Sequence, residues 1–147
     1  MAQDVVVGES KANERYDGLS HAKLRLLYHV VLATKYRRRC LAGVERELAD
    51  AVVASAEGMD FEVVDVGIDN GDHAHLLVRV RKADVGIGRV VRRVKSVTTK
   101  RMWDACAGEL RRHYWGKGRK LWSNGYFAAT VGNDVQTVSG YIQRQAK

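Results

Sequence analysis

The stretch that decides the fold runs from residue 61 to residue 80 and reads FEVVDVGIDNGDHAHLLVRV. Residues 61–68 and 73–80 are rich in β-branched and aliphatic side chains, which is typical of strands. Residues 69–72, between them, contain the pair Asn70-Gly71, which favours a tight turn. We therefore predict a β-hairpin with its tip at this pair.

Elements of regular spacing flank the hairpin on both sides. Residues 23–34 are rich in strand formers and predict a long buried strand that opens into a basic loop. Residues 41–59 and 87–103 carry apolar side chains at intervals of three to four, which indicates two amphipathic helices. Many β-branched residues in the second segment argue for a strand, but its spacing and length favour a helix. A last strand over residues 126–131 and a terminal helix over residues 134–145 complete the chain.

The predicted order is strand, helix, strand, strand, helix, strand and an additional helix. This is the order of the α+β ferredoxin-like (split βαβ) fold, in which a four-stranded antiparallel sheet carries helices on one face. Residues 1–22 are polar and lack periodicity, so we expect a flexible N-terminal arm followed by a single domain over residues 23–147. Such folds host many functions, so particular residues have to decide the function.

Charge is unevenly distributed along the chain. The 147 residues include 25 Lys and Arg against 17 Asp and Glu, a formal net charge of +8. Residues 73–122 hold 14 of the basic and 3 of the acidic residues, a net charge of +11, which leaves −3 for the remainder. One basic face on an acidic body is typical of a protein that binds nucleic acid. A basic solvated surface without a partner would give the same composition.

Several classes of protein are disfavoured. Cys40 and Cys106 have no metal-finger spacing and cannot build a disulfide framework, which fits a reducing compartment. No apolar stretch approaches the ~20 residues that a membrane span needs, and the N-terminus lacks a signal-peptide pattern. We expect a cytoplasmic protein without a membrane partner.

Two basic clusters also contain aromatic residues. The first, residues 35–39, reads KYRRR, and the second, residues 111–122, reads RRHYWGKGRKLW. Basic groups can bind phosphates while rings stack on unpaired bases, at roughly 1–3 kcal/mol per base. Some rings, Trp122 above all, could instead anchor the second cluster to the core. The residues predicted to contact DNA are Lys35, Tyr36, Arg37, Arg38, Arg92, Arg93, Lys95, Arg112, Tyr114, Trp115, Lys117, Arg119 and Lys120.

Five residues are candidates for the chemistry. His73 and His75 alternate along one predicted strand, so both imidazoles project from one face, where they could clamp a divalent metal. Two histidines on a solvated strand would look the same. Asp72 could orient a ring N–H, but its position favours a turn residue. Tyr141 and Gln145 share a helix face, and a tyrosine beside a metal can be a nucleophile, although a lone tyrosine near a C-terminus is more often a core residue.

Together these motifs resemble the TnpA family of small HUH single-tyrosine insertion-sequence transposases. The matching residues, in the family's order, are Tyr28-His29-Val30-Val31, Thr34-Lys35-Tyr36-Arg37-Arg38, Asp72-His73-Ala74-His75-Leu76-Leu77, Leu121-Trp122-Ser123, Tyr126-Phe127, Val131-Gly132, Tyr141-Ile142 and Gln145. The resemblance covers the chain from about Leu27 to its end. One departure is the pair Asn70-Gly71, where family members often have a proline.

The resemblance implies a DNA transposase that recognises hairpins at insertion-sequence ends and cleaves and rejoins single-stranded DNA there. Tyr141 would be the catalytic residue that forms a 5′-phosphotyrosine. His73, His75 and Gln145 would hold a divalent metal, Mg²⁺ or Mn²⁺. It also implies a homodimer, with residues 23–147 as a single HUH transposase domain. Two alternatives stay open: a domesticated or replication-type HUH nuclease, and a non-catalytic nucleic-acid-binding ferredoxin-like module.

Overall fold

The computed structural model describes residues 26–82 and 84–131. The elements, in chain order, are β1 (Leu26–Ala33), the short 3-10 helix η1 (Lys35–Arg37), α1 (Glu45–Ser55), β2 (Phe61–Asp69), β3 (His73–Val80), α2 (Ile87–Arg111) and β4 (Phe127–Val131). The arm predicted for residues 1–22 and the helix predicted for residues 134–145, with Tyr141 and Gln145, lie outside the described residues.

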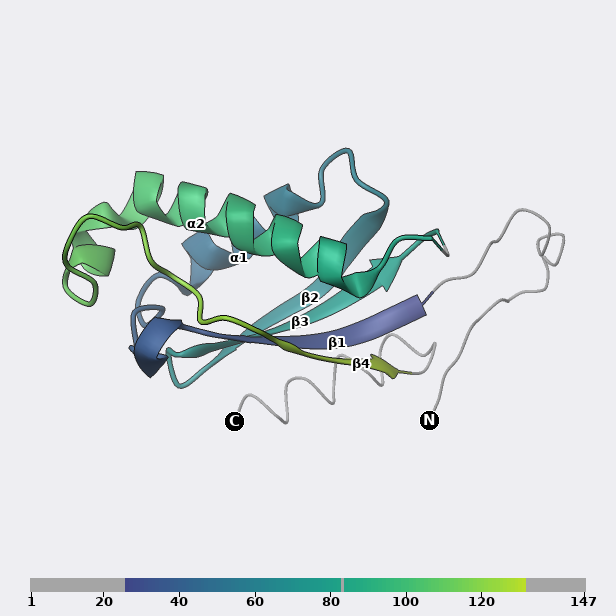
Figure 1. The fold of residues 1–147 in the computed structure, drawn as a ribbon, viewed down its shortest axis with the longest axis horizontal. Coiled ribbons are helices and arrows are strands. Elements are labelled where there is room, and N and C mark those ends of the chain that lie inside the picture. Colours follow the sequence, from purple (N-terminus) through teal and green to yellow (C-terminus); the bar gives the residue numbers. More distant parts are fainter. Residues whose placement is uncertain (1–25, 83, 132–147) are drawn as a thin grey trace, which may run out of the picture.

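The four strands form one antiparallel sheet in the order β2-β3-β1-β4. The central pair runs in register from Leu26 opposite Val80 to Ala33 opposite His73, although α1 and β2 separate the two strands along the chain. Helices α1 and α2 pack against each other and cover one face of the sheet (Figure 1). This arrangement confirms the predicted ferredoxin-like fold class.

The core lies between the sheet and the two helices. Side chains of a strand alternate between its faces, so every second residue of β1 and β3 points into this layer. The buried side chains that meet there include Val30, Leu32, Leu76, Val78, Leu48, Val52, Val94 and Met102. The same alternation sends His29, His73 and His75 to the opposite face, which we call the outer face. The predicted histidine pair is thus kept out of the main core.

The second helix is longer than predicted. The sequence indicated a helix over residues 87–103, but α2 continues to Arg111, with a kink at Cys106. Trp103, Cys106 and Leu110 continue the helical spacing of three to four residues, and all three are buried. Their packing in the core stabilises the additional turns of α2. Across residues 26–82 and 84–131, no helix combines the length and apolar content that crossing a lipid bilayer requires.

The hairpin tip docks against the segment that precedes α1. Asn70 and Gly71 have φ angles of 57° and 72°, the conformation that an Asn-Gly turn favours. The Leu41 amide donates to the Gly71 carbonyl at 2.9 Å, and Arg39 Nε donates to the Asn70 carbonyl at 3.0 Å. A Cβ on Gly71 would lie 3.3 Å from the Ala42 Cβ. The tip therefore needs glycine, and its docking places the start of β3 beside η1.

Candidate active site and nucleic-acid interface

His73, the first residue of β3, is held between two charged groups. Its Nδ1 lies 2.6 Å from Asp72 Oδ1, and its Nε2 lies 2.5 Å from Arg37 Nη1. A guanidinium can only donate, so Nε2 is the acceptor and the ring proton sits on Nδ1, where it is donated to the carboxylate. The Nε2 atom of His73 thus faces outward from β3 to Arg37.

Asp72 closes the hairpin turn and also orients the His73 ring, whereas the sequence favoured a role in the turn only. Its amide donates to the Asp69 carbonyl at 3.2 Å, which closes the turn as expected. Its buried carboxylate also orients the His73 ring. The sequence interpretation of Asp72 as a turn residue was therefore incomplete, because the direction of a side chain in a turn cannot be read from its type.

His75 contacts a third histidine that the sequence analysis did not single out as a site residue. Its Nδ1 lies 3.1 Å from His29 Nε2, and the two rings stack with centroids 5.4 Å apart. Burial lowers the pKa of His29, and the nearby His75 lowers it further. Burial also lowers the pKa of His75; the Asp69 carboxylate opposes this change, and His73 adds to it. The pKa of each ring therefore lies below the ordinary value for histidine, and a hydrogen bond joins the two rings.

The sequence feature that could have identified His29 as a site residue is its position in the predicted first strand. Every second residue of that strand faces outward, and the ferredoxin-like order sets β1 beside β3. The register places Val31 opposite His75 and Ala33 opposite His73, so His29 lies two residues along the same face from the position opposite His75. The contact itself depends on the register, which the sequence does not state.

The two histidines of β3 fit the requirements of a divalent metal. Each has its Nδ1 engaged by a neighbour, the arrangement that turns Nε2 of a histidine toward a metal. In the described part of the chain, no group of three or more His, Cys, Asp and Glu residues could hold a metal by itself. A site here needs a further ligand, which the resemblance assigns to Gln145. Mg²⁺ and Mn²⁺ both favour oxygen ligands, which a glutamine side-chain carbonyl would supply beside the two imidazoles.

Arg37 reaches His73 because the backbone of η1 takes an unusual course. Tyr36 and Arg37 have φ angles of 61° and 54°. These angles lie in the left-handed region, which costs a non-glycine residue about 1–2 kcal/mol. Hydrogen bonds hold the start of η1: the Lys35 amide donates to the Leu121 carbonyl, and the Tyr114 hydroxyl donates to the Lys35 carbonyl, each at 2.8 Å. Strain of this kind persists where the surroundings hold a segment in place.

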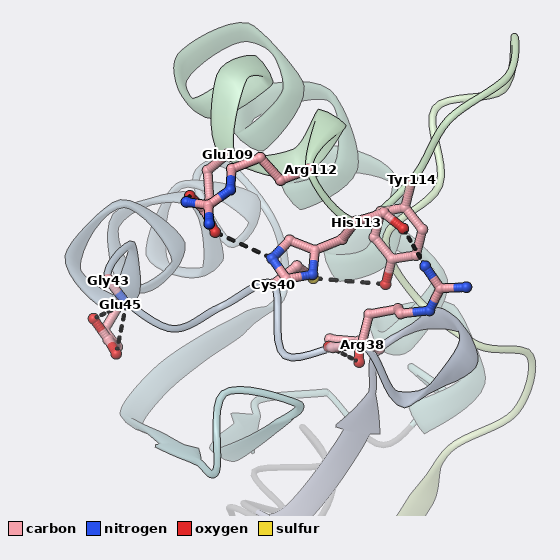
Figure 2. Close-up of polar contacts among 9 residues, drawn as sticks. Arg38, Cys40, Gly43, Glu45, Glu109, Arg112, His113 and Tyr114 are labelled. Carbon is pink, nitrogen blue, oxygen red and sulfur yellow. Dashed lines mark hydrogen bonds and ion pairs between the residues drawn. The ribbon is translucent and has the colours of Figure 1, made fainter.

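Two exposed rings lie close to the Arg38 guanidinium. Its Cζ lies 5.4 Å from the ring centroid of Tyr36 and 4.9 Å from that of Trp115. Its Nη1 donates to the His113 carbonyl at 2.5 Å (Figure 2). Tyr36 is 59% exposed and Trp115 is 69% exposed. We call Tyr36, Arg38 and Trp115 the aromatic platform, because its open rings offer flat surfaces for stacking beside a cation.

Two other aromatic side chains of the second basic cluster, Tyr114 and Trp122, are buried and attach this segment to the core. Tyr114 is only 3% exposed, and Figure 2 shows its hydroxyl facing the Cys40 thiol, 3.6 Å away. Burial raises the pKa of Tyr114 far above its ordinary value, with the Cys40 thiol adding to the effect. A ring enclosed in this way cannot stack on a base, so Tyr114 leaves the set of predicted DNA contacts. Trp122 Nε1 donates to Thr98 Oγ1 at 2.8 Å, which makes Trp122 the core anchor that we considered.

A basic groove runs between α2 and residues 119–124. Its charged lining residues are Lys35, Arg92, Lys95, Lys100, Arg119 and Lys120. The Asp104 carboxylate pairs with two of them, Lys100 at 3.1 Å and Arg119 at 3.4 Å. Burial lowers the pKa of Lys95, whose ammonium donates to the carbonyls of Ser123 at 2.9 Å and Gly125 at 2.8 Å. Lys95 therefore holds the wall of the groove. We call this surface the basic groove; such a row of cations suits a phosphate backbone.

The remaining predicted contacts lie apart from the basic groove. Arg93 Nε donates to the Ser55 carbonyl at 3.0 Å, on the side of α2 that faces α1, so the structure places it at the end of α1. Arg112 pairs with Glu109 at 3.2 Å, as Figure 2 shows. Lys117 is exposed on the loop that carries Trp115. The predicted set thus divides between the groove, the platform and sites with local partners.

Comparisons with known proteins bear on the whole chain. The model of a family described as IS200-like transposases matches residues 22–145. The transposases for insertion sequence element IS200 of Salmonella typhimurium and Salmonella typhi are each 24% identical over 128 residues, 86% of this chain and 81% of theirs. A solved structure from Deinococcus radiodurans R1, described as a transposase, has a TM-score of 0.66 and 26% identity, covering 95% of this chain and 98% of that one. A REP-associated tyrosine transposase bound to a REP hairpin shares the fold, with a TM-score of 0.51 and 14% identity over 82% of this chain and 62% of its own.

Proposed function

This chain belongs to the family of IS200-like transposases, and we propose that it cleaves and rejoins single-stranded DNA at insertion-sequence ends through a 5′-phosphotyrosine on Tyr141. The observation that carries the proposal is the pair of outer-face histidines beside a cationic turn: His73 presents its Nε2 toward Arg37 of η1. A phosphate approaching η1 would meet positive charge and two imidazoles together. That combination serves phosphoryl transfer better than mere binding.

The chemistry divides between the ion and the chain. A divalent ion, Mg²⁺ or Mn²⁺, held by His73, His75 and Gln145, would supply Lewis-acid polarisation of the scissile phosphate. The Tyr141 oxygen would attack phosphorus, so that a P–O bond to tyrosine forms and the bond to the 3′ oxygen breaks. The tyrosine would release its proton to solvent, and the departing 3′ oxygen would take one up from solvent to leave a 3′-OH. Attack by another 3′-OH on the phosphotyrosine reverses these steps. The phosphodiester energy is retained in the adduct, so joining needs no nucleotide cofactor.

DNA contacts follow from the two surfaces around η1. The cations of the basic groove would bind backbone phosphates, and the aromatic platform would stack on unpaired bases. Open rings suit single-stranded DNA, because the bases of a duplex are already stacked. One fold neighbour is bound to a REP hairpin, which makes a hairpin with a single-stranded flank the first ligand to test.

We also propose a homodimer as the working unit. Within the described residues, β2 and β4 are the outer strands of the sheet, and each offers one edge to a further strand. Pairing such an edge with a second copy would cover it and bring two sites into one particle. Two single-tyrosine sites suit an exchange of strands between two DNA ends.

The test of the cleavage chemistry is the substitution Tyr141→Phe. With a labelled hairpin oligonucleotide and Mn²⁺, the wild type should form an SDS-resistant protein–DNA adduct. Tyr141→Phe and His73→Ala should still bind the oligonucleotide but form no adduct, because one lacks the nucleophile and the other a ligand. Tyr126→Phe, which removes the hydroxyl of an exposed tyrosine in the described part of the chain, serves as the matched control and should react normally. An adduct with Tyr141→Phe would refute the nucleophile, and full activity in EDTA would refute the metal.

A further inference from the structure

We propose that Arg37 guards the metal-binding nitrogen of His73, occupying its lone pair until a metal ion takes that place. The contact is direct, with Arg37 Nη1 at 2.5 Å from His73 Nε2. This is the nitrogen that the proposed site would present to the ion, since Nδ1 is bound to the Asp72 carboxylate. The inference rests on the proposed metal site and adds a residue that controls access to it.

The guanidinium and the ion exclude each other at this nitrogen. An imidazole nitrogen has one lone pair, which either accepts a hydrogen bond or ligates a metal. The guanidinium also carries a positive charge, so it repels a divalent cation that approaches the same ring. Asp72 stays bound to Nδ1 in either state, and the ring therefore keeps its orientation during the exchange. The exchange requires Arg37 to move and leaves His73 in place.

The backbone of η1 holds the Arg37 guanidinium next to His73 Nε2. The side chain of Arg37 can still rotate away from this position. The left-handed backbone of Tyr36 and Arg37 points the guanidinium at β3, and the bonds of Lys35 to Leu121 and Tyr114 hold the start of the turn. The Arg37 side chain is itself exposed. Rotation of its side chain can therefore break the bond to His73 without any change of the backbone. A DNA phosphate near η1 would draw the guanidinium outward by a stronger, charge-assisted contact.

The test measures Mn²⁺ binding by calorimetry or electron paramagnetic resonance, without DNA. Arg37→Gln should bind Mn²⁺ about tenfold more tightly than the wild type, as expected when a charge-assisted hydrogen bond to the ligand is lost. Arg37→Lys keeps the charge but has a different donor geometry and should fall between them. Arg46→Gln is the matched control, because it removes the same charge from an exposed residue of α1. It should bind Mn²⁺ as the wild type does.

A second measurement needs neither metal nor activity. The ¹⁵N spectrum of the metal-free wild type should show His73 Nε2 as a hydrogen-bonded acceptor, and Arg37→Gln should shift that resonance to the position of an unbonded acceptor. Equal or weaker Mn²⁺ binding by a folded Arg37→Gln protein would overturn the proposed role of Arg37 and leave the proposed metal site standing. If no protein binds Mn²⁺, the proposed metal site fails and the guard fails with it. Should Arg37→Gln not fold, Arg37→Lys and the wild-type spectrum still decide, and the absence of an acceptor signal overturns the guard.

Discussion

At the scale of single residues, burial separates aromatic side chains that have the same appearance in the sequence. Trp115 and Tyr114 are neighbours in one basic cluster, yet one ring is exposed and the other lies in the core. The exposed ring rests on Arg38, which also contacts Tyr36, so its outer face is held ready for a flat ligand. The buried ring connects η1 to the end of α2 through its hydroxyl. The burial of Tyr114 gives it a structural role, whereas we propose that Trp115 contacts the ligand.

This difference predicts the effect of removing Trp115. Trp115→Ala should weaken binding of a single-stranded oligonucleotide by about 1–3 kcal/mol, the usual contribution of one stacked base, and should leave the melting temperature nearly unchanged. Fluorescence anisotropy at a fixed salt concentration measures the affinity. Tyr126→Ala is the control, because its exposed ring lies beside Gly88 in the first turn of α2, away from the platform. Equal losses for the two variants would contradict a specific platform.

At the scale of elements, the active-site geometry depends on how the β2–β3 hairpin docks. Its tip contacts residues 39–42 through the Gly71 carbonyl and the close approach of Gly71 to Ala42. The same docking brings Asp72 to Thr34, whose amide donates to the Asp72 carbonyl at 3.0 Å. The tip and η1 are therefore one unit, and a displaced tip would separate His73 from Arg37.

Gly71→Ala tests that unit. Gly71 has a φ of 72°, and a residue other than glycine in this region lowers the free energy of unfolding by about 1–2 kcal/mol. The new methyl group would also press on Ala42. Gly58→Ala is a matched control, because Gly58 has the same φ of 72° with nothing within 4 Å of the added carbon. Urea unfolding should show the larger loss for Gly71→Ala, and its Mn²⁺ affinity should rise, because the displaced tip withdraws His73 from Arg37. Equal losses with unchanged metal binding would contradict the docking argument.

At the scale of the whole molecule, the two faces of the sheet have different roles. One face is covered by α1 and α2 (Figure 1) and contributes most of the core. The outer face carries the three histidines. A small second cluster around Leu27 and Leu77 supports the outer face. Chemistry on one face and stability on the other allow the site to change without loss of the fold.

The proposed dimer predicts complementation between two inactive variants. In a site shared between chains, a mixed dimer of His73→Ala and Tyr141→Phe has one site with a native histidine pair from one protomer and a native tyrosine from its partner. Adduct formation should then return in part after subunit exchange, measured with a labelled hairpin oligonucleotide. A site built within one chain predicts no recovery, because each chain lacks one component. A monomer by light scattering, or no recovery after demonstrated exchange, would contradict the shared site.

Local spacing in the sequence determined the elements and their order. The alternation of residues 61–80, the turn at Asn70-Gly71 and the helical spacing of residues 41–59 and 87–103 depend on near neighbours, and the ferredoxin-like fold follows from their order. The shared face of His73 and His75 is likewise a local property, because alternate residues of a strand face the same side. The basic surplus of residues 73–122 is also a property of composition alone.

Only the tertiary structure decided which groups meet. The bond between His29 and His75 joins residues 46 apart, and that between Arg37 and His73 joins residues 36 apart, so each needs a strand register or a docked turn that no local pattern states. The burial of Tyr114 beside the exposed Trp115 depends on how the end of α2 packs on η1. Propensity and periodicity act over a few residues, whereas the protonation of a ring or its access to DNA depends on neighbours that folding brings from elsewhere in the chain.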